Sequence, residues 1–385
     1  MITVSEKVII FLILLSSQIF PGNNLIIISL FSILFLFFLI TYYSKFRKYQ
    51  FPFYSIPVIV FVLITLIFQF EDFNSFIRQF SRLVYPWLLL CVYNLLIIKN
   101  TNDPKKISEI LKFTSISIYF ILIPDFLSLI YTAITNTNNL IILKLASITY
   151  RETNTTAFLL FYTIIFRIEN KLANRKEILF AFLALTLTFS RSSIFLFFVY
   201  VIYKLINDLF EKFDSNNFKL IFSRLFPFLI LGAMYSIYLF LKIDSSTMQT
   251  YALSIYDKSF GTRILIFDFI NYYFSTIDFS EILNFLIGYG WVKYQNLLAE
   301  LPFIYEGTVG HTFIGILPEY GFIYTSFLFL FFYIRAFRGF IADCFLVGLS
   351  ILAFFPFPYA SPILCLIQVH RRLNFLNNRK ISISV

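Results

Sequence analysis

The feature that most constrains this chain is a succession of long apolar runs, separated by short polar turns along its whole length. A helix needs about 20 predominantly apolar residues to cross a bilayer. Helices are the expected form of such runs, because they satisfy their own backbone hydrogen bonds where lipid offers no water. Charged residues make up only 14% of the chain, whereas soluble domains carry about 25%. The pattern predicts an all-α, polytopic transmembrane helix bundle.

The apolar runs predict about 12 helices in a single integral membrane domain over residues 1–385. The first run lacks a small-residue cleavage site, so it is interpreted as a membrane helix and not as a signal peptide. The three cysteines all lie in apolar runs and predict no disulfide framework. The expected helices cover residues 8–20, 24–43, 53–70, 83–99, 111–133, 157–170, 178–189, 192–206, 224–242, 311–335, 340–356 and 359–370.

The distribution of basic residues predicts the orientation of these helices. More than two thirds of the 31 Lys and Arg residues lie in segments that share one side if both termini are cytoplasmic. Cytoplasmic loops are enriched in Lys and Arg, so this side is predicted to be the cytoplasm. The same topology explains the net charge of +10, and we therefore expect no nucleic-acid partner.

Residues 178–206 test the predicted orientation, because basic segments flank them on both sides. One long helix would place the two flanks on opposite sides of the membrane. Two short helices meeting at Ser190-Arg191-Ser192-Ser193 place both in the cytoplasm. Each would be too short to cross a layer of about 30 Å. The turn that carries Arg191 is therefore expected below the outer surface, in a cavity.

One outer loop, residues 243–310, is long and is expected to be inserted in the bundle as a large periplasmic loop. Ile264, Phe267, Ile270, Phe274 and Ile277 repeat at helical spacing within it. This spacing predicts an amphipathic helix on the membrane surface or over the mouth of the bundle. Pro302 and the Gly288-Tyr289-Gly290 segment predict turns.

His311 is the first candidate for chemistry, since imidazole accepts a proton near neutral pH. It precedes an apolar helix, and Glu319 follows eight residues later on the same face. The carboxylate could orient the imidazole or bind sugar hydroxyls, or it could be a structural partner for an arginine. Equally, His311 could be a helix-start residue hydrogen-bonded to a neighbouring loop. Tyr289 and Tyr320 could stack on sugars, although interface aromatics are the default interpretation.

The outward-facing arginines form a second group of candidates, because topology disfavours them. Arg191 could bind phosphate oxygens through its fork of donors, or it could be a structural arginine paired with a carboxylate. Arg263 opens the amphipathic helix and could also be an ordinary surface residue. Arg151 could simply pair with the adjacent Glu152. No cluster of metal ligands, phosphate-binding loop or dinucleotide fingerprint occurs, so neither a metal nor another cofactor is expected.

Three stretches together resemble the superfamily of O-antigen ligases and O-antigen polymerases. The first is similar to that family's threonine-serine-arginine turn, the second to the arginine helix and Gly-x-Gly of its periplasmic loop, and the third to its His…Glu-x-Gly stretch. Tyr150-Arg151 with Asn154 and Ala157 also fits. The family often has Asn after the histidine, where this chain has Thr312. The three stretches are Thr186–Ser192, Gly261-Thr262-Arg263 with Leu286–Gly290, and His311 with Glu319-Tyr320-Gly321.

The resemblance implies an inner-membrane glycosyltransferase that needs no metal and acts at the periplasmic face. The implied donor is a glycan linked to undecaprenyl diphosphate, and membrane lipid surrounds the protein. A chain-length regulator protein is a further implied partner. Arg191, Arg263 and Arg151 would bind the diphosphate. His311 would be the catalytic base, and Glu319, Tyr289 and Tyr320 would bind the sugars.

Several functions remain open at this point. An O-antigen polymerase transfers the glycan to a sugar hydroxyl of another lipid-linked repeat unit, and it is the preferred prediction. An O-antigen ligase shares the donor but transfers the glycan to lipid A-core. A transporter of lipid-linked glycans would need charges along a central path, whereas here the unusual charges gather at the outer end. The remaining alternative is a purely structural membrane protein.

Overall fold

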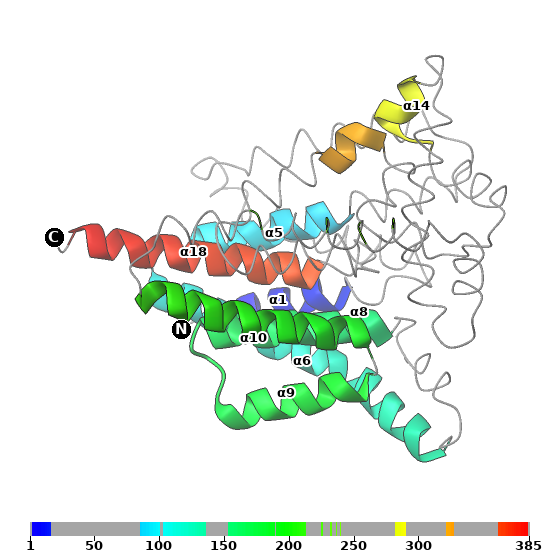
Figure 1. Ribbon diagram of the computed structural model, residues 1–385. Helices are drawn as coiled ribbons and strands as arrows, with labels where there is room; N and C mark the ends of the chain where they lie inside the picture. Colours follow the sequence, from blue (N-terminus) through cyan, green and yellow to red (C-terminus); the bar gives the residue numbers. More distant parts are fainter. Residues whose placement is uncertain are drawn as a thin grey trace. The chain divides into compact units, whose positions relative to one another are not determined.

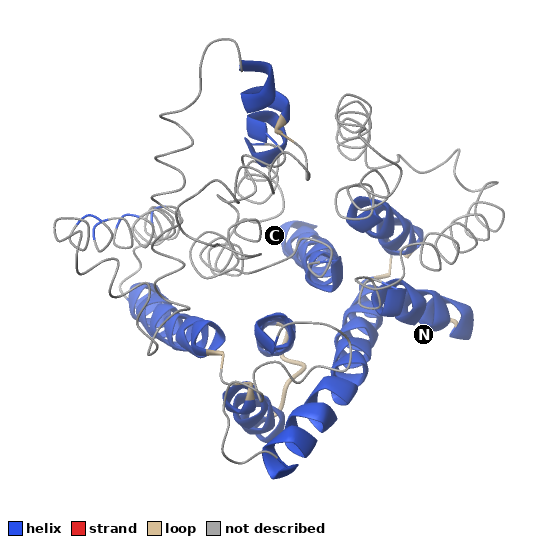
Figure 2. Cartoon of the chain, turned by 90° about the vertical axis from the view of Figure 1, so that its right-hand side faces the viewer, coloured by secondary structure: helices blue, strands red, loops and turns tan. Residues whose placement is uncertain are grey.

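The computed structural model describes part of the chain, and every described element is a helix. Figure 2 shows helices and no strands among the described residues. This confirms the all-α prediction for these residues. The predicted set of about 12 helices includes ranges that are not described. The described residues are 2–16, 85–100, 103–135, 153–188, 190–212, 225, 232, 236, 239, 282–289, 321–326 and 361–383.

The chain divides into two compact units. Unit 1 comprises Met1–Leu66, Asp72–Ile194 and Pro356–Val385, and unit 2 comprises Ile67–Glu71 and Phe195–Phe355. Unit 1 contains α1 (Val4–Ser16), α5 (Tyr85–Lys99), α6 (Pro104–Thr135), α8 (Thr153–Glu169), α9 (Arg175–Leu187), the first turn of α10 (Arg191–Lys212) and α18 (Ser361–Ile383) (Figure 1). Unit 2 contains the rest of α10, α14 (Ile282–Ile287) and a helical segment at 321–326.

The core of unit 1 forms where α18 packs against α5, α6 and α8, with α1 against α5 and α6. Tyr93, Phe158, Phe161, Tyr162 and Phe166 are its largest fully buried side chains. Buried aromatic side chains of this size contribute much of the apolar area that holds helices together. The core therefore joins elements from the first and the last parts of the chain.

α6 is the longest described helix, and local capping determines where it begins. Asp103 accepts hydrogen bonds from the backbone of Lys105 (3.0 Å) and Lys106 (3.2 Å) through Oδ1. Pro104 occupies the first helical position, where its missing N–H costs nothing. The helix thus begins seven residues before the expected span 111–133. Among the described helices, only α6 is both long and apolar enough to cross a membrane.

α6 and α8 run antiparallel, and two polar contacts set their register. Arg167 of α8 donates to Ser115 Oγ (2.8 Å), and Thr156 of α8 donates to Asp125 Oδ2 (3.0 Å). Ten residues of α6 therefore match eleven residues of α8, which is about 15 Å along the helix axis. α9 lies beside α6, since Tyr119 of α6 donates to Glu177 of α9 (3.0 Å).

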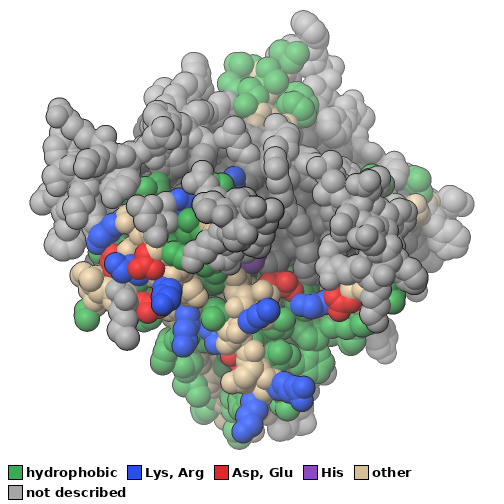
Figure 3. All heavy atoms as spheres, turned by 90° about the vertical axis from the view of Figure 1, so that its left-hand side faces the viewer, with side chains coloured by type: hydrophobic (Ala, Val, Ile, Leu, Met, Phe, Trp, Pro, Cys, Tyr) green, Lys and Arg blue, Asp and Glu red, His purple; other side chains and the backbone are tan. Residues whose placement is uncertain are grey.

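Several basic segments of unit 1 lie at one end of the helices. Lys99 bonds to Glu6 (2.8 Å), Ile2 N donates to Glu109 (2.8 Å), and Asn170 lies 2.9 Å from His370. The start of α1, the α5–α6 and α8–α9 connections and the basic part of α18 therefore share this end. Figure 3 shows Lys and Arg side chains gathered on the face that forms the left side of Figure 1. The distribution of basic residues predicts a cytoplasmic location for these segments.

α18 continues beyond the position at which the sequence predicted it to end. The expected helix covers 359–370, whereas α18 runs to Ile383. No Gly or Pro interrupts residues 371–383, and basic side chains are favourable near a helix C-terminus. The helix therefore continues about 20 Å past His370, and its C-terminal end projects at the left of Figure 1.

Candidate functional site

The predicted site residues divide between described and undescribed parts of the chain. Arg191 is the first residue of α10, and Tyr289 directly follows the glycine after α14. The other five predicted site residues lie outside the described residues, as do the amphipathic helix and the Pro302 turn of the periplasmic loop. These five are His311, Arg263, Arg151, Glu319 and Tyr320.

The break between α9 and α10 is a buried polar turn. α9 ends at Leu187 with Thr188 as its C-cap, and α10 begins at Arg191. Two helices therefore meet here, as predicted, but Arg191, Ser192 and Ser193 belong to α10 and not to the turn. α10 has 22 residues and is longer than the short helix that was predicted. Thr188, Ser190 and Ser193 each have 0% of their surface exposed, so this irregular backbone lies inside unit 1.

Hydroxyl groups hold this turn in place. Thr188 Oγ1 accepts a hydrogen bond from Ser190 N (3.3 Å) and donates to Leu185 O (2.6 Å). The hydroxyls of Ser190 and Ser193 lie 3.1 Å apart. Ser190 O accepts from the backbone of Ser193 and Ile194, both at 3.1 Å, and Ser190 thus caps α10. The positive end of the α10 dipole therefore lies at the backbone of Arg191 and the residues that follow it.

In unit 2, two of the predicted site segments contact each other through glycine backbone. Gly288 and Gly321 have φ angles of 95° and 78°, which L side chains rarely adopt. A Cβ on Gly321 would lie 2.3 Å from Ile287 C and 2.5 Å from Gly288 N. The backbone of 286–288 therefore packs directly on Gly321. α14 ends at Ile287, and Gly288, the first residue of the predicted turn, follows it.

A ring contact extends this junction. Phe285 and Phe322 stack with centroids 5.4 Å apart and ring planes at 20°. Tyr289 is the next residue after Gly288, while Tyr320 and Glu319 directly precede Gly321 in the sequence. The fold thus brings the backbone of 286–288 against Gly321, although about 30 residues separate them in the chain.

Asp125 is a buried carboxylate that the sequence analysis missed. It lies in the middle of α6, is 1% exposed, and accepts a hydrogen bond from Thr156 in the first turn of α8. Burial of a carboxylate among apolar side chains is costly unless hydrogen bonds compensate it. The signal was present, because Asp125 is the one carboxylate of the expected span 111–133.

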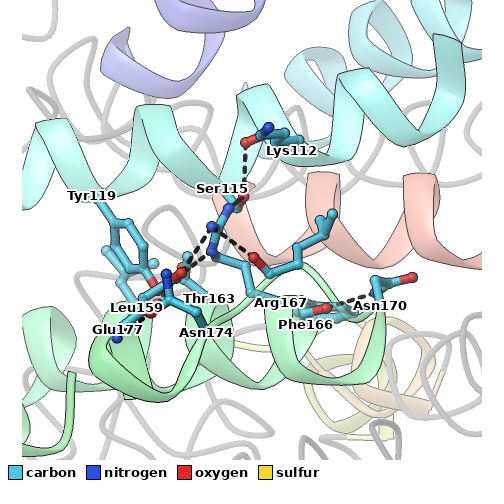
Figure 4. Close-up of polar contacts among 11 residues, drawn as sticks. Lys112, Ser115, Tyr119, Leu159, Thr163, Phe166, Arg167, Asn170, Asn174 and Glu177 are labelled. Carbon is cyan, nitrogen blue, oxygen red and sulfur yellow. Dashed lines mark hydrogen bonds and ion pairs between the residues drawn. The ribbon is translucent and has the colours of Figure 1, made fainter. Parts of the chain in front are cut away.

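A second polar cluster, centred on Arg167, holds α6, α8 and α9 together (Figure 4). Arg167 forms a two-pronged ion pair with Glu177, one prong from Nε and one from Nη2 (3.0 Å). It also donates to Ser115 Oγ and, at 3.3 Å, to Leu172 O. Its guanidinium carbon lies 5.7 Å from the centre of the Tyr119 ring. Each donor group is therefore directed at the protein itself, which indicates a structural role.

His370, the second histidine, also has a structural environment. Its Nδ1 lies 2.9 Å from the Asn170 side-chain nitrogen, and its ring meets Phe166 edge-on at 5.5 Å. These contacts attach α18 to the end of α8. Within the described residues, no three metal-ligating side chains form a group that could hold a metal ion.

The chain matches no protein-family model, no curated protein and no solved structure.

Proposed function

We propose that this protein is a polytopic inner-membrane glycosyltransferase of the O-antigen polymerase type. It transfers a glycan from undecaprenyl diphosphate to a sugar hydroxyl of another lipid-linked repeat unit at the periplasmic face. Both chain termini lie in the cytoplasm. The observation that carries the proposal is the Gly321 junction, because it unites two of the three stretches on which the resemblance rests.

The distribution of side chains on α6 supports the membrane location. Its buried face includes Thr114 (0% exposed), Ser115 (0%) and Asp125 (1%), whereas between Phe120 and Ile134 its exposed side chains are apolar. A soluble helix has the opposite pattern, with polar side chains outside. The exposed apolar residues of α6 are Phe120, Ile123, Leu127, Ile130, Tyr131 and Ile134.

The buried turn before α10 supports the assignment of Arg191 to the diphosphate. Irregular backbone at membrane depth is tolerated where protein buries it or where it lines a water-filled cavity. Arg191 and the N-terminal dipole of α10 would stabilise negative charge as it develops on the leaving diphosphate. By the resemblance, Arg263 and Arg151 would bind the same group.

In the proposed reaction, the acceptor hydroxyl oxygen forms a bond to the anomeric carbon of the donor glycan. The bond between that carbon and the diphosphate oxygen breaks, and undecaprenyl diphosphate leaves with the electron pair. His311 takes the proton of the hydroxyl as general base. Glu319, Tyr289 and Tyr320 hold the sugars. The energy of the glycosyl diphosphate drives the transfer without any nucleotide.

A lipopolysaccharide gel of a deletion strain tests the proposal. Loss of a polymerase leaves core with a single repeat unit, because a ligase can still transfer one unit. Bare core, with polymer retained on the carrier lipid, would instead identify this protein as the ligase. An unchanged ladder would overturn both assignments.

Complementation with single variants then tests the residues. His311→Ala and Arg191→Ala should each abolish the long bands while the protein still inserts, since one removes the base and the other a diphosphate ligand. Arg82→Ala is the matched control, because it removes an outer arginine to which no role is assigned. Long bands of normal intensity in the Arg191→Ala strain would refute the role of Arg191.

A further inference from the structure

An apolar groove runs along the outside of unit 1 between α6 and α9. Its volume is about 240 Å³. For comparison, an apolar cavity of ~150 Å³ engineered in another protein is large enough to bind benzene. Phe180, one of its lining residues, is 77% exposed, so the groove opens to the outside of the unit. The main lining residues are Tyr119, Leu122 and Phe126 of α6 with Glu177, Ala181 and Ala184 of α9.

The groove exists because α9 presents small side chains to large ones. Ala181 and Ala184 are three residues apart, so they lie on one face of α9. They are placed opposite Leu122 and Phe126, which leaves a hollow that no side chain of either helix fills. One end of the groove is polar, because there Tyr119 donates a hydrogen bond to Glu177 (3.0 Å).

Basic side chains lie at this polar end. Lys171, Arg175 and Lys176, here called the basic turn, are all exposed. Arg175 and Lys176 directly precede Glu177, which lines the groove. Glu177 is already ion-paired with Arg167, and the exposed charged side chains between 170 and 176 are all positive.

The backbone of the basic turn is held in one conformation. Leu172 N and Ala173 N both donate to Arg167 O, at 2.8 and 3.2 Å. Asn174 caps α9 by accepting from Glu177 N (2.8 Å). Lys171 has a φ of 55°, a left-handed conformation that usually favours glycine. A lysine is thus present at a position whose backbone conformation favours glycine.

We propose that the groove binds one acyl chain of an anionic phospholipid, whose phosphate lies against the basic turn. An apolar channel that ends in clustered cations matches the two chemically different parts of such a lipid. The inference rests on the membrane location in the proposed function, but not on the glycosyl transfer. It assigns the groove to a lipid of the leaflet on the side of the basic turn.

Photo-crosslinking of the unmodified chain tests this site directly. The full chain is incubated with phosphatidylglycerol that carries a diazirine on an acyl chain, and the adducts are mapped by peptide mass spectrometry. Phosphatidylcholine with the same acyl chain is the matched probe. Adducts should concentrate at 119–126 and 177–184, with about fivefold more from phosphatidylglycerol. Adducts spread over all exposed apolar faces, or equal labelling by both probes, would overturn the proposal.

Two groups of variants sharpen the test. Ala184→Phe fills the hollow and should remove most groove adducts, whereas Leu183→Phe enlarges an adjacent residue that is 51% exposed and does not line the groove. Arg175→Gln with Lys176→Gln should lower phosphatidylglycerol labelling to the phosphatidylcholine level. Undiminished labelling of Ala184→Phe contradicts the site. If that variant does not fold, the map of the unmodified chain decides.

The outcome can be separated from that of the proposed function. Loss of the polysaccharide ladder on deletion, together with no groove adducts, refutes the lipid site and leaves the transferase standing. Groove adducts together with an unchanged ladder support the lipid site and refute the transferase. Recovery of the intact chain outside the membrane fraction refutes both.

Discussion

At the scale of single residues, Glu6 shows how unit 1 uses a buried charge. It is 3% exposed and accepts hydrogen bonds from Lys99 Nζ (2.8 Å), Thr3 N (2.8 Å) and Asn100 Nδ2 (3.3 Å). Burial by itself raises the pKa of Glu6, but these bonds outweigh it and lower the pKa from 4.5 to about 2. The carboxylate thereby joins the start of α1 to the end of α5.

The lowered pKa predicts a specific pH dependence of stability. A group with a lower pKa in the folded state stabilises the fold fully above its unfolded pKa. This contribution is therefore present above about pH 4.5 and is lost as the pH falls toward about 2. Glu6→Gln should lower the free energy of unfolding at pH 7 by about 1–3 kcal/mol, and its difference from the unmodified chain should shrink below pH 4.5.

Thermal unfolding in detergent at a series of pH values measures this effect. Asp208→Asn serves as control, because Asp208 is an exposed carboxylate of α10. A difference between Glu6→Gln and the unmodified chain that stays constant down to pH 2 would exclude the proposed linkage to Glu6.

At the scale of elements, the contact between 286–288 and the segment 321–326 depends on the absence of one side chain. Gly321→Ala would place a Cβ 2.3 Å from Ile287 C and would also strain a residue at φ 78°. The backbone atoms cannot yield as a flexible side chain could, so the two segments must separate. We expect a loss of more than about 1 kcal/mol in stability, together with loss of the long polysaccharide bands.

Gly232→Ala is the matched control, since a Cβ added at Gly232 would meet nothing within 4 Å. In a helix, alanine is favoured over glycine by about 1 kcal/mol, so this variant should be neutral or more stable. Thermal unfolding and the lipopolysaccharide gel give the two readouts. Equal behaviour of the two variants would show that the junction has no role in the site.

At the scale of the whole molecule, the shared end of the unit 1 helices predicts the accessibility of its connections. Lys105 follows the α5–α6 connection and Arg175 begins α9, and both belong to segments predicted to be cytoplasmic. Lys144 belongs to a predicted outer segment. In a background whose three native cysteines are replaced by alanine, Lys144→Cys should react with a membrane-impermeant maleimide in intact cells.

Lys105→Cys and Arg175→Cys should react only after the cells are permeabilised. Reaction of Lys105→Cys and Arg175→Cys on opposite sides of the membrane would contradict the structure, which places the α5–α6 and α8–α9 connections at one end. Reaction of both from outside would keep the fold but reverse the proposed orientation.

Much of the helical framework was predictable because its signals are local. The helix over 111–133 was predicted from its apolar run, although its start at Pro104 was missed because the Asp103 cap lies before that run. The break at Ser190 was predictable from the basic segments on both sides of 178–206. The extension of α18 was not, because its residues after 370 are mostly polar and lie outside the apolar run from which the helix was predicted.

The candidate site was predictable only in part. The segments that carry Arg191 and Tyr289 were recognised from the sequence, and the turn at Gly288 has the expected backbone. The packing of Gly321 on Ile287 and the burial of Asp125 against Thr156 were not anticipated. Both are contacts between segments about 30 residues apart, which depend on how helices pack and not on their own periodicity.

The sequence alone determined that the described chain is helical and that two helices, α9 and α10, meet near Ser190. These properties follow from the periodicity of apolar residues, from capping residues and from the distribution of charge, which are local features of the sequence. Only the tertiary structure decided that Gly321 meets 286–288, that Arg167 locks three helices together, and that two alanines of α9 leave a groove against α6. Such contacts depend on side-chain volume and register between distant segments, which no local pattern encodes.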